Sequence, residues 1–152
     1  MSVRLSEDEI WRELETAHTG ILTTLRKDGM PITLPIWFVM LDRKIYVQGP
    51  AKTKKFNRVR NDPRCSFLVE SGKRWAELRA VQLNGHARII EDEAMKARVK
   101  AAMDAKYDAF RSNRAAMPEA TAKHYSSGTT LIEITPDPRM LSWDNAKLGM
   151  KG

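Results

Sequence analysis

A short basic segment has the residue types and the position expected of a phosphate site. Lys52-Thr53-Lys54-Lys55 follows Gly49-Pro50-Ala51 and opens an expected helix over residues 53–60. The first turn of a helix has unpaired amides and a partial positive charge, so it attracts anions. Thr53 can cap the helix or donate its hydroxyl to a phosphate, while Lys54 and Lys55 add charge at the same end. The pattern fits a phosphate cradle and fits equally a lysine-rich turn exposed to solvent.

No other group of residues forms a recognisable catalytic motif. The three histidines, His18, His86 and His124, are too far apart in the sequence to show metal-ligand spacing, and we expect no metal site. Cys65 lies on the apolar face of an expected strand and is most simply a small core residue. The sequence has neither G-x-G-x-x-G nor a P-loop, so neither nucleotide motif is supported. We therefore nominate no catalytic side chain.

The charge of the chain limits its partners. Its 152 residues include 26 lysines and arginines against 19 acidic residues, a formal charge of +7. That charge suits a nucleic acid, an anionic membrane or a phosphorylated small ligand. Few aromatic residues lie among the basic ones, which gives little support to base stacking. We expect no nucleic acid and no membrane as partner, and a nucleic-acid-binding barrel stays open as an alternative.

Length and composition indicate one domain over residues 1–152. One cysteine excludes an intramolecular disulfide framework. No apolar run approaches the roughly 20 residues that span a bilayer, and the first residues lack the apolar core of a signal peptide. The expected location is therefore the cytoplasm.

Hydropathy patterns predict a mainly β protein, a six-stranded antiparallel split β-barrel with peripheral helices. Asp28-Gly29 signals a hairpin, and Gly85 signals a bend or a bulge where a long strand curves. Pro35 has no amide donor, so it predicts an edge, a bulge or an interrupted ladder, and Pro136 and Pro138 are expected to end the last strand. Such a small barrel is filled by side chains, so a cofactor would bind in a surface groove or between subunits. The expected strands are 20–25, 31–41, 45–48, 65–69, 78–90 and 130–135, and the longer helices are 6–17, with a capping box at its start, and 92–110.

Four short motifs carry a resemblance to a known family. They are D-G-x-P at 28–31, T-K-K at 53–55, N-D-P-R-C-S-F at 61–67 and N-G-x-A-R-I at 84–89. In this order and spacing, the run over residues 20–90 resembles the pyridoxamine 5'-phosphate oxidase-like family of flavin-binding split barrels. A weaker match covers 130–143.

The resemblance implies a homodimer with FMN bound at each side of the subunit interface. FMN would exchange a hydride with a small-molecule substrate. The strand at Leu34 would lie along the flavin ring, with main-chain groups of Pro35, Ile36 and Trp37 at its polar edge. The remaining contacts implied by the resemblance are Gln48 and Gly49 at the ribityl chain, Thr53, Lys54 and Lys55 at the phosphate, Arg79 from the long strand, and Trp143 and Lys147 of the partner subunit.

The tail of the chain differs from that of true pyridoxamine phosphate oxidases. They carry an arginine-histidine pair after the tail tryptophan, whereas this sequence has Trp143-Asp144-Asn145-Ala146-Lys147. Vitamin B6 oxidation is therefore not expected. The tail is similar to that of small reductases in the superfamily, several of which use the deazaflavin coenzyme F-420.

Coenzyme F-420 is the alternative to FMN, because its phosphodiester and polyglutamate tail would suit a basic groove. A non-catalytic flavin- or haem-binding module is a further alternative. Trp143 would either touch the cofactor or fill the dimer interface, and the segment from Arg111 to Ser127 would be either a lid or a surface connection. The expected groove residues are Lys52, Lys54, Lys55, Arg58 and Arg60.

Overall fold

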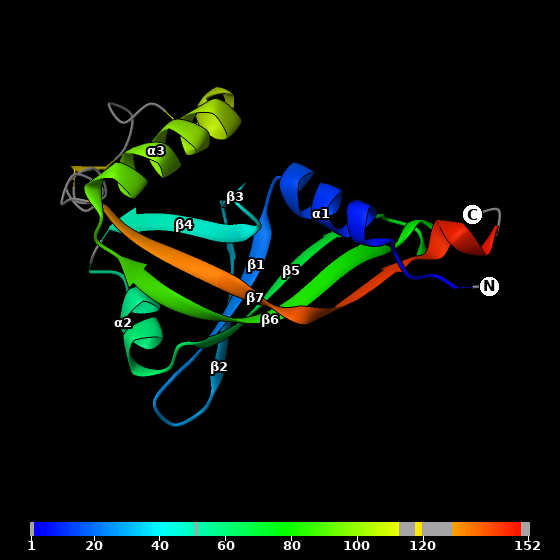
Figure 1. The fold of residues 1–152 in the computed structure, drawn as a ribbon, viewed down its shortest axis with the longest axis horizontal. Helices are drawn as coiled ribbons and strands as arrows, with labels where there is room; N and C mark the ends of the chain where they lie inside the picture. The colour runs from blue at the N-terminus through cyan, green and yellow to red at the C-terminus, as the bar shows by residue number, and fades with distance from the viewer. Residues whose placement is uncertain (1, 51, 113–117, 120–128, 150–152) are drawn as a thin grey trace.

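A computed structural model describes residues 2–50, 52–112, 118–119 and 129–149. Its centre is one curled antiparallel sheet of seven strands in the order β2-β1-β5-β6-β7-β4-β3 (Figure 1). The expected mainly β barrel is confirmed. The strands are β1 (Gly20–Leu25), β2 (Pro31–Ile36), β3 (Val39–Leu41), β4 (Lys44–Pro50), β5 (Arg64–Ser71), β6 (Arg79–Ile90) and β7 (Thr129–Asp144).

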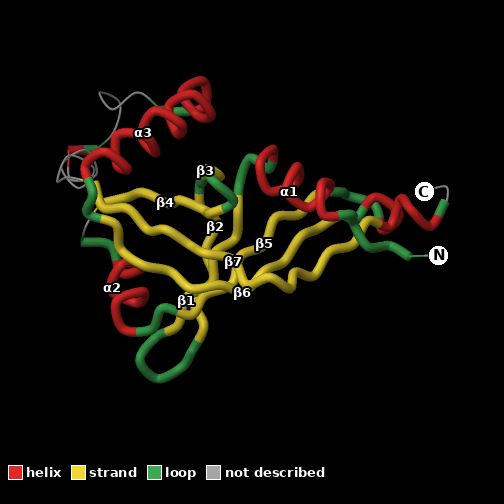
Figure 2. Tube along the Cα trace, in the orientation of Figure 1, coloured by secondary structure: helices red, strands yellow, loops and turns green. Residues whose placement is uncertain are grey.

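In the described part of the chain, the longer helices lie around the outside of the sheet, as Figure 2 shows. Helix α1 begins after Ser6, whose hydroxyl accepts a hydrogen bond from the Glu9 amide at 3.2 Å, as a capping residue does. Helix α2 follows β4, and α3 lies beside β4 (Figure 1). The helices are α1 (Glu7–Thr16), α2 (Lys54–Asn61) and α3 (Glu93–Tyr107), with 3₁₀ turns η1 (Trp75–Glu77), η2 (Asp108–Phe110) and η4 (Asn145–Leu148).

Apolar side chains form two clusters, one on each side of the sheet. The larger fills the inside of the curled sheet and includes Phe67, Val81 and, from α2, Phe56. The smaller lies under α3, where Met103 and Tyr107 pack against apolar residues of β3, β4, β6 and β7. Cys65 belongs to the larger cluster, and burial raises the pKa of its thiol to about 12. The sheet thus fixes α2 and α3 against opposite faces.

The strand count differs from the six expected because residues 31–41 do not form one strand. The chain breaks at Trp37 and Phe38, between β2 and β3. Pro35 lies in β2, which is an edge strand paired only with β1, opposite Ile21. An edge strand tolerates proline because one row of its amides has no ladder partner.

The expectation that Pro136 and Pro138 end the last strand is wrong, since β7 continues to Asp144. Its register with β6 shifts between Leu83 and Gly85, which pair with Met140 and Pro136. Pro138 lies within this irregularity, where a ladder amide is not required. The register irregularity therefore lies next to Gly85, as predicted, but the extra residues, 137–139, are in β7, while β6 pairs regularly with β5 through Gly85. A Cβ at Gly85 would lie 2.6 Å from the Thr135 carbonyl oxygen.

Two further observations complete the fold. Most of the segment from Arg111 to Ser127, including His124, lies outside the described residues. Within the described residues, no helix has the length and apolar character needed to cross a membrane.

Candidate functional site

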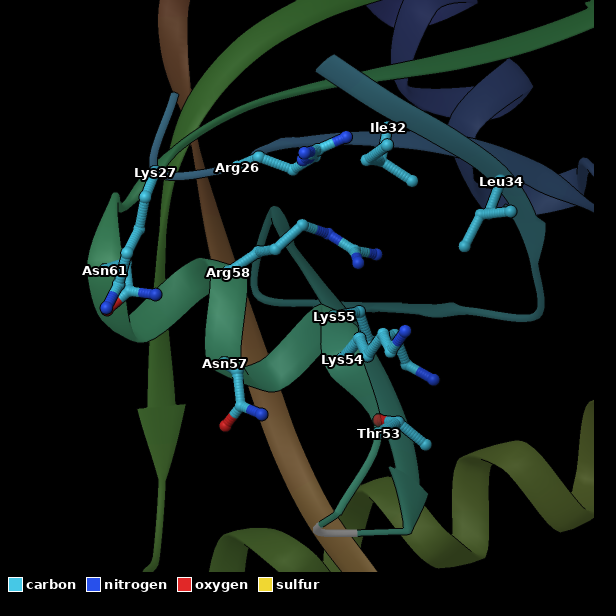
Figure 3. A pocket seen from close by; sticks show the side chains of 10 residues that line it. All are labelled: Arg26, Lys27, Ile32, Leu34, Thr53, Lys54, Lys55, Asn57, Arg58 and Asn61. Atoms are coloured by element: carbon cyan, nitrogen blue, oxygen red, sulfur yellow. The ribbon is translucent and has the colours of Figure 1, made fainter. Parts of the chain in front are cut away.

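A pocket of about 920 Å³ opens between β2, α2 and the turn that joins β1 to β2. Figure 3 shows Ile32 and Leu34 extending from β2 towards α2, while Lys55 and Arg58 extend from α2 into the space below β2. The turn is the expected hairpin, with Gly29 at a φ of 86°. The pocket is lined by Arg26, Lys27, Ile32, Leu34, Thr53, Lys54, Lys55, Asn57, Arg58 and Asn61.

The pocket has a strongly positive wall. Among the described residues, its lining includes five basic side chains and no acidic one. Arg26 pairs with Asp28 at 3.1 Å between Nη2 and Oδ2, at the exposed turn. Within the described part of the chain, no ion pair is found for the other four, which are Lys27, Lys54, Lys55 and Arg58. Such a wall attracts an anion from solution.

Lys55 lies against the end of β4. A Cβ added to Gly49 would be 3.0 Å from the Lys55 Nζ, so the absent side chain leaves room for the ammonium. Burial, and secondarily the charge of Arg58, lowers the pKa of Lys55. A bound anion would offset both effects, because it supplies the opposite charge that the described residues do not.

Thr53 is the N-cap residue of α2, yet its side chain makes no capping hydrogen bond. Its Oγ1 is buried without a hydrogen-bond partner among the described residues. A buried hydroxyl without a partner is costly, and the Thr53 side chain leaves the first amides of the helix uncapped. An anion seated at this helix end would accept hydrogen bonds from the hydroxyl and the amides.

Arg58 is fixed in the pocket wall by β1. Its Nε donates to the Oγ1 of Thr24 at 2.7 Å, and Thr24 is almost fully buried. Burial lowers the pKa of Arg58, although an arginine stays charged at neutral pH. The hydrogen bond to Thr24 therefore gives the guanidinium a defined place opposite Leu34 and Ile32.

The structure brings some of the predicted cofactor residues together. Leu34, Thr53, Lys54 and Lys55 line one pocket, and Gly49 lies against Lys55. The other predicted residues near them are Pro35 and Ile36 on β2, Trp37 at the break after it, and Gln48 on β4, opposite Leu131 of β7.

Three other predicted residues do not line this pocket in the same chain. Arg79 forms ion pairs with Glu13 at 2.8 Å and Asp144 at 3.1 Å. Lys147 pairs with Glu9 at 2.8 Å, and Trp143 stands opposite Ala80 in β7. These residues belong to the end of the sheet that carries both termini (Figure 1). Trp143 and Lys147 could therefore reach a cofactor at this pocket only from a second subunit, as the resemblance implies. Arg79 instead forms ion pairs with two carboxylates of its own chain.

Two residues of the positive wall, Arg26 and Lys27, were not predicted from the sequence. Lys52 and Arg60, expected in the groove, are exposed and do not line the pocket, whereas Arg26 and Lys27 do. Both missed residues precede Asp28-Gly29, and the only local signal was their charge beside a turn. No set of three metal-ligating side chains gathers anywhere in the described ranges.

Comparison with known proteins identifies the fold family. The family model described as pyridoxamine 5'-phosphate oxidase matches residues 6–138. No curated protein matches the chain. A conserved hypothetical protein, Rv2991 from Mycobacterium tuberculosis, has a solved structure that is 29% identical, with a TM-score of 0.83 over 99% of this chain and 92% of that one.

Two more distant structures share the fold alone. An F-420 reductase is 19% identical, with a TM-score of 0.63 over 86% of this chain and 94% of that one. HutZ, the heme storage protein from Vibrio cholerae, is 15% identical, with a TM-score of 0.69 over 94% and 96%. From the family model and the curled antiparallel sheet together, the chain belongs to the pyridoxamine 5'-phosphate oxidase family of split β-barrels.

Proposed function

We propose that this protein is a flavin-dependent oxidoreductase that binds FMN and exchanges a hydride with a small molecule. The observation that carries the proposal is the anion site at the start of α2. There an uncapped helix end and an unpartnered, buried Thr53 hydroxyl adjoin Lys55 and Arg58, which have no ion-pair partner in the described ranges. These donors match the charge and the acceptor oxygens of a phosphate.

The chain's residues would divide the work of holding the cofactor. Thr53, Lys54 and Lys55, with Arg58, would bind the phosphate, and Gln48 and Gly49 would line the ribityl chain. Main-chain groups of Pro35, Ile36 and Trp37 would face the polar edge of the ring, with Leu34 beside it. Bound flavin supplies the hydride chemistry, and the protein orients the ring and excludes competing reactions. The tail lacks the arginine-histidine pair of true pyridoxamine phosphate oxidases, so the substrate is not pyridoxamine phosphate.

The proposed assembly is a homodimer with the cofactor between subunits. Met30 lies just before the edge strand β2, and Leu34 lies on it. They are 56% and 45% exposed, which leaves apolar surface next to the pocket. A second copy of the chain would cover it and bring Trp143 and Lys147 of the partner subunit to the cofactor. Burial of exposed apolar surface of this kind favours association.

Coenzyme F-420 is the second candidate, and the size of the basic wall favours it. One phosphate group is matched by the cations on α2, whereas Arg26 and Lys27 extend the positive wall to the β1–β2 turn. A phosphodiester with an acidic tail would occupy such an extended wall. The FMN and F-420 proposals therefore differ in whether the turn contributes to affinity.

The test is a titration of the purified protein with FMN, F-420 and haem, followed by absorption and fluorescence. Saturable FMN binding, with reduction of the bound flavin by a hydride donor, supports the proposal. Tighter binding of F-420, weakened selectively in an Arg26→Gln/Lys27→Gln variant, supports the second candidate. Haem binding alone indicates a storage or sensing module. Salt-dependent oligonucleotide binding with no cofactor binding indicates a nucleic-acid-binding barrel and overturns the proposal.

A further inference from the structure

The chain between β2 and β3 is held from outside the sheet by the end of α3. Phe38 has no partner in the strand register on either side of the break. Its amide donates instead to the Tyr107 Oη at 3.0 Å, and its carbonyl oxygen accepts from the Lys106 Nζ at 2.9 Å. Both polar main-chain groups of Phe38 are therefore satisfied by side chains 68 and 69 residues away in sequence.

The Tyr107 hydroxyl ties a third segment to this break. It lies 2.7 Å from the carbonyl oxygen of His18 and 2.9 Å from that of Phe38. A hydroxyl has a single proton to donate, and Lys106 already donates to the Phe38 carbonyl. The proton of Tyr107 is thus available to the nearer His18 carbonyl, just before β1. One side chain links α3, the β2–β3 break and the start of β1.

Aromatic packing on the Tyr107 ring also restrains the β2–β3 break. The Trp37 indole stacks on the Tyr107 ring with centroids 4.3 Å apart and planes 4° from parallel. The His18 ring meets Tyr107 edge-on at 5.3 Å. Tyr107 is fully buried. The orientation of Trp37 is therefore set by α3 rather than by a neighbouring strand.

Lys106 is partly buried and binds a main-chain carbonyl group instead of a carboxylate. Its Nζ lies 3.9 Å from the centroid of the Phe38 ring, and it has no ion pair within the described ranges. Burial lowers the pKa of this ammonium to about 8. A partly desolvated ammonium that binds a carbonyl and no carboxylate costs stability. Such a cost is typical of residues retained for a function.

We infer that Tyr107 and Lys106 are positioning residues for the cofactor ring, acting through the main chain of Ile36, Trp37 and Phe38. The inference rests on the proposed function, which assigns the main chain of residues 35–37 to the polar edge of the ring. Among the described strands, β2 pairs with β1 alone, and beyond Ile36 the main chain has no ladder partner until β3 begins at Val39. Groups that orient a ligand must be held within about 0.5 Å. Tyr107 and Lys106 supply that restraint.

The test compares two conservative variants with wild-type protein. Tyr107→Phe keeps the stacked ring and removes the hydroxyl, and Lys106→Met keeps the apolar stem and removes the ammonium. Each is titrated with FMN, and the absorption spectrum and midpoint potential of the bound FMN are measured. We expect affinity to fall by about 2- to 10-fold, the value of one hydrogen bond, with a shifted flavin spectrum and potential. Lys106→Met also provides the test if Tyr107→Phe does not fold.

Tyr46→Phe is the matched control. Tyr46 is buried in the same cluster under α3 and pairs with Val39, but its hydroxyl donates to the Glu133 Oε2 at 2.8 Å rather than to the main chain of the β2–β3 break. This variant should lose comparable stability and leave the spectrum and potential of bound FMN unchanged. The inference is overturned if both Tyr107→Phe and Lys106→Met bind FMN with wild-type spectrum and potential, or if Tyr46→Phe shifts them equally. Failure of wild-type protein to bind FMN instead refutes the proposed function, and the inference with it.

Discussion

Replacing Lys55 by methionine should lower FMN affinity without lowering the stability of the apoprotein. The substitution keeps an apolar stem beside Phe56, over whose ring the Lys55 Nζ lies at 5.2 Å, and removes the charge. A hydrogen bond to a charged group contributes about 1.5–3 kcal/mol, which corresponds to about a 10- to 150-fold loss of FMN affinity. Burial has already removed part of the hydration of the Lys55 ammonium. If the phosphate displaces the remaining water, the loss of affinity should lie in the upper part of that range.

The apoprotein should not lose stability in this variant. Lys55 has no ion pair in the described ranges, and its pKa is lowered by burial and by Arg58. A lowered folded-state pKa means that the folded protein disfavours the charged lysine at neutral pH. The cost disappears when the charge does, so the free energy of unfolding of Lys55→Met should equal or exceed that of wild type at pH 7.

Two measurements decide this prediction. Quenching of FMN fluorescence gives the dissociation constant, and thermal unfolding without ligand gives the apoprotein stability. Lys52→Met is the matched control, since Lys52 is exposed, lies three residues earlier and does not line the pocket. It should change neither quantity appreciably. Unchanged FMN affinity in Lys55→Met, or a loss equal to that of the control, would refute the phosphate assignment.

Three further predictions follow from single side chains. Thr53→Val should weaken FMN binding by about tenfold without lowering the melting temperature of the apoprotein, because the buried Thr53 Oγ1 has no hydrogen-bond partner to lose among the described residues. A matching drop in melting temperature would show that the hydroxyl supports the fold instead. For Lys106, the pKa is about 8 when folded against 10.5 ordinarily, so the unfolded chain binds more protons between these values and wild-type stability should rise there with pH. Urea unfolding at pH 7, 8.5 and 10 should show the free energy of unfolding of wild type increasing relative to that of Lys106→Met. Parallel dependence of the two free energies on pH would contradict this. Gly20→Ala should destabilise the fold by about 1–3 kcal/mol, because its Cβ would lie 2.0 Å from the Phe67 ring; urea unfolding at wild-type stability would contradict the packing.

The sequence determined those features that depend on neighbouring residues. The cap at Ser6, the hairpin at Gly29, the helix after Thr53 and the strand irregularity next to Gly85 each follow from the conformational preference of one or two residues. The order of these short patterns also indicated the family. Lys54, Lys55 and Thr53 were found because a helix start brings adjacent residues to one end.

Tertiary structure alone decided the features that join distant segments. Arg26 and Lys27 reach the pocket because the β1–β2 turn lies beside α2, and Arg58 is fixed by Thr24, 34 residues earlier. The Phe38 amide donates to the hydroxyl of Tyr107, which no local pattern connects with it. The side-chain period of a strand shows which residues share a face, but strand pairing and helix packing set what that face meets. The positive wall of the pocket and the contacts of Tyr107 and Lys106 with Phe38 are therefore consequences of how the sheet curls and where the helices pack.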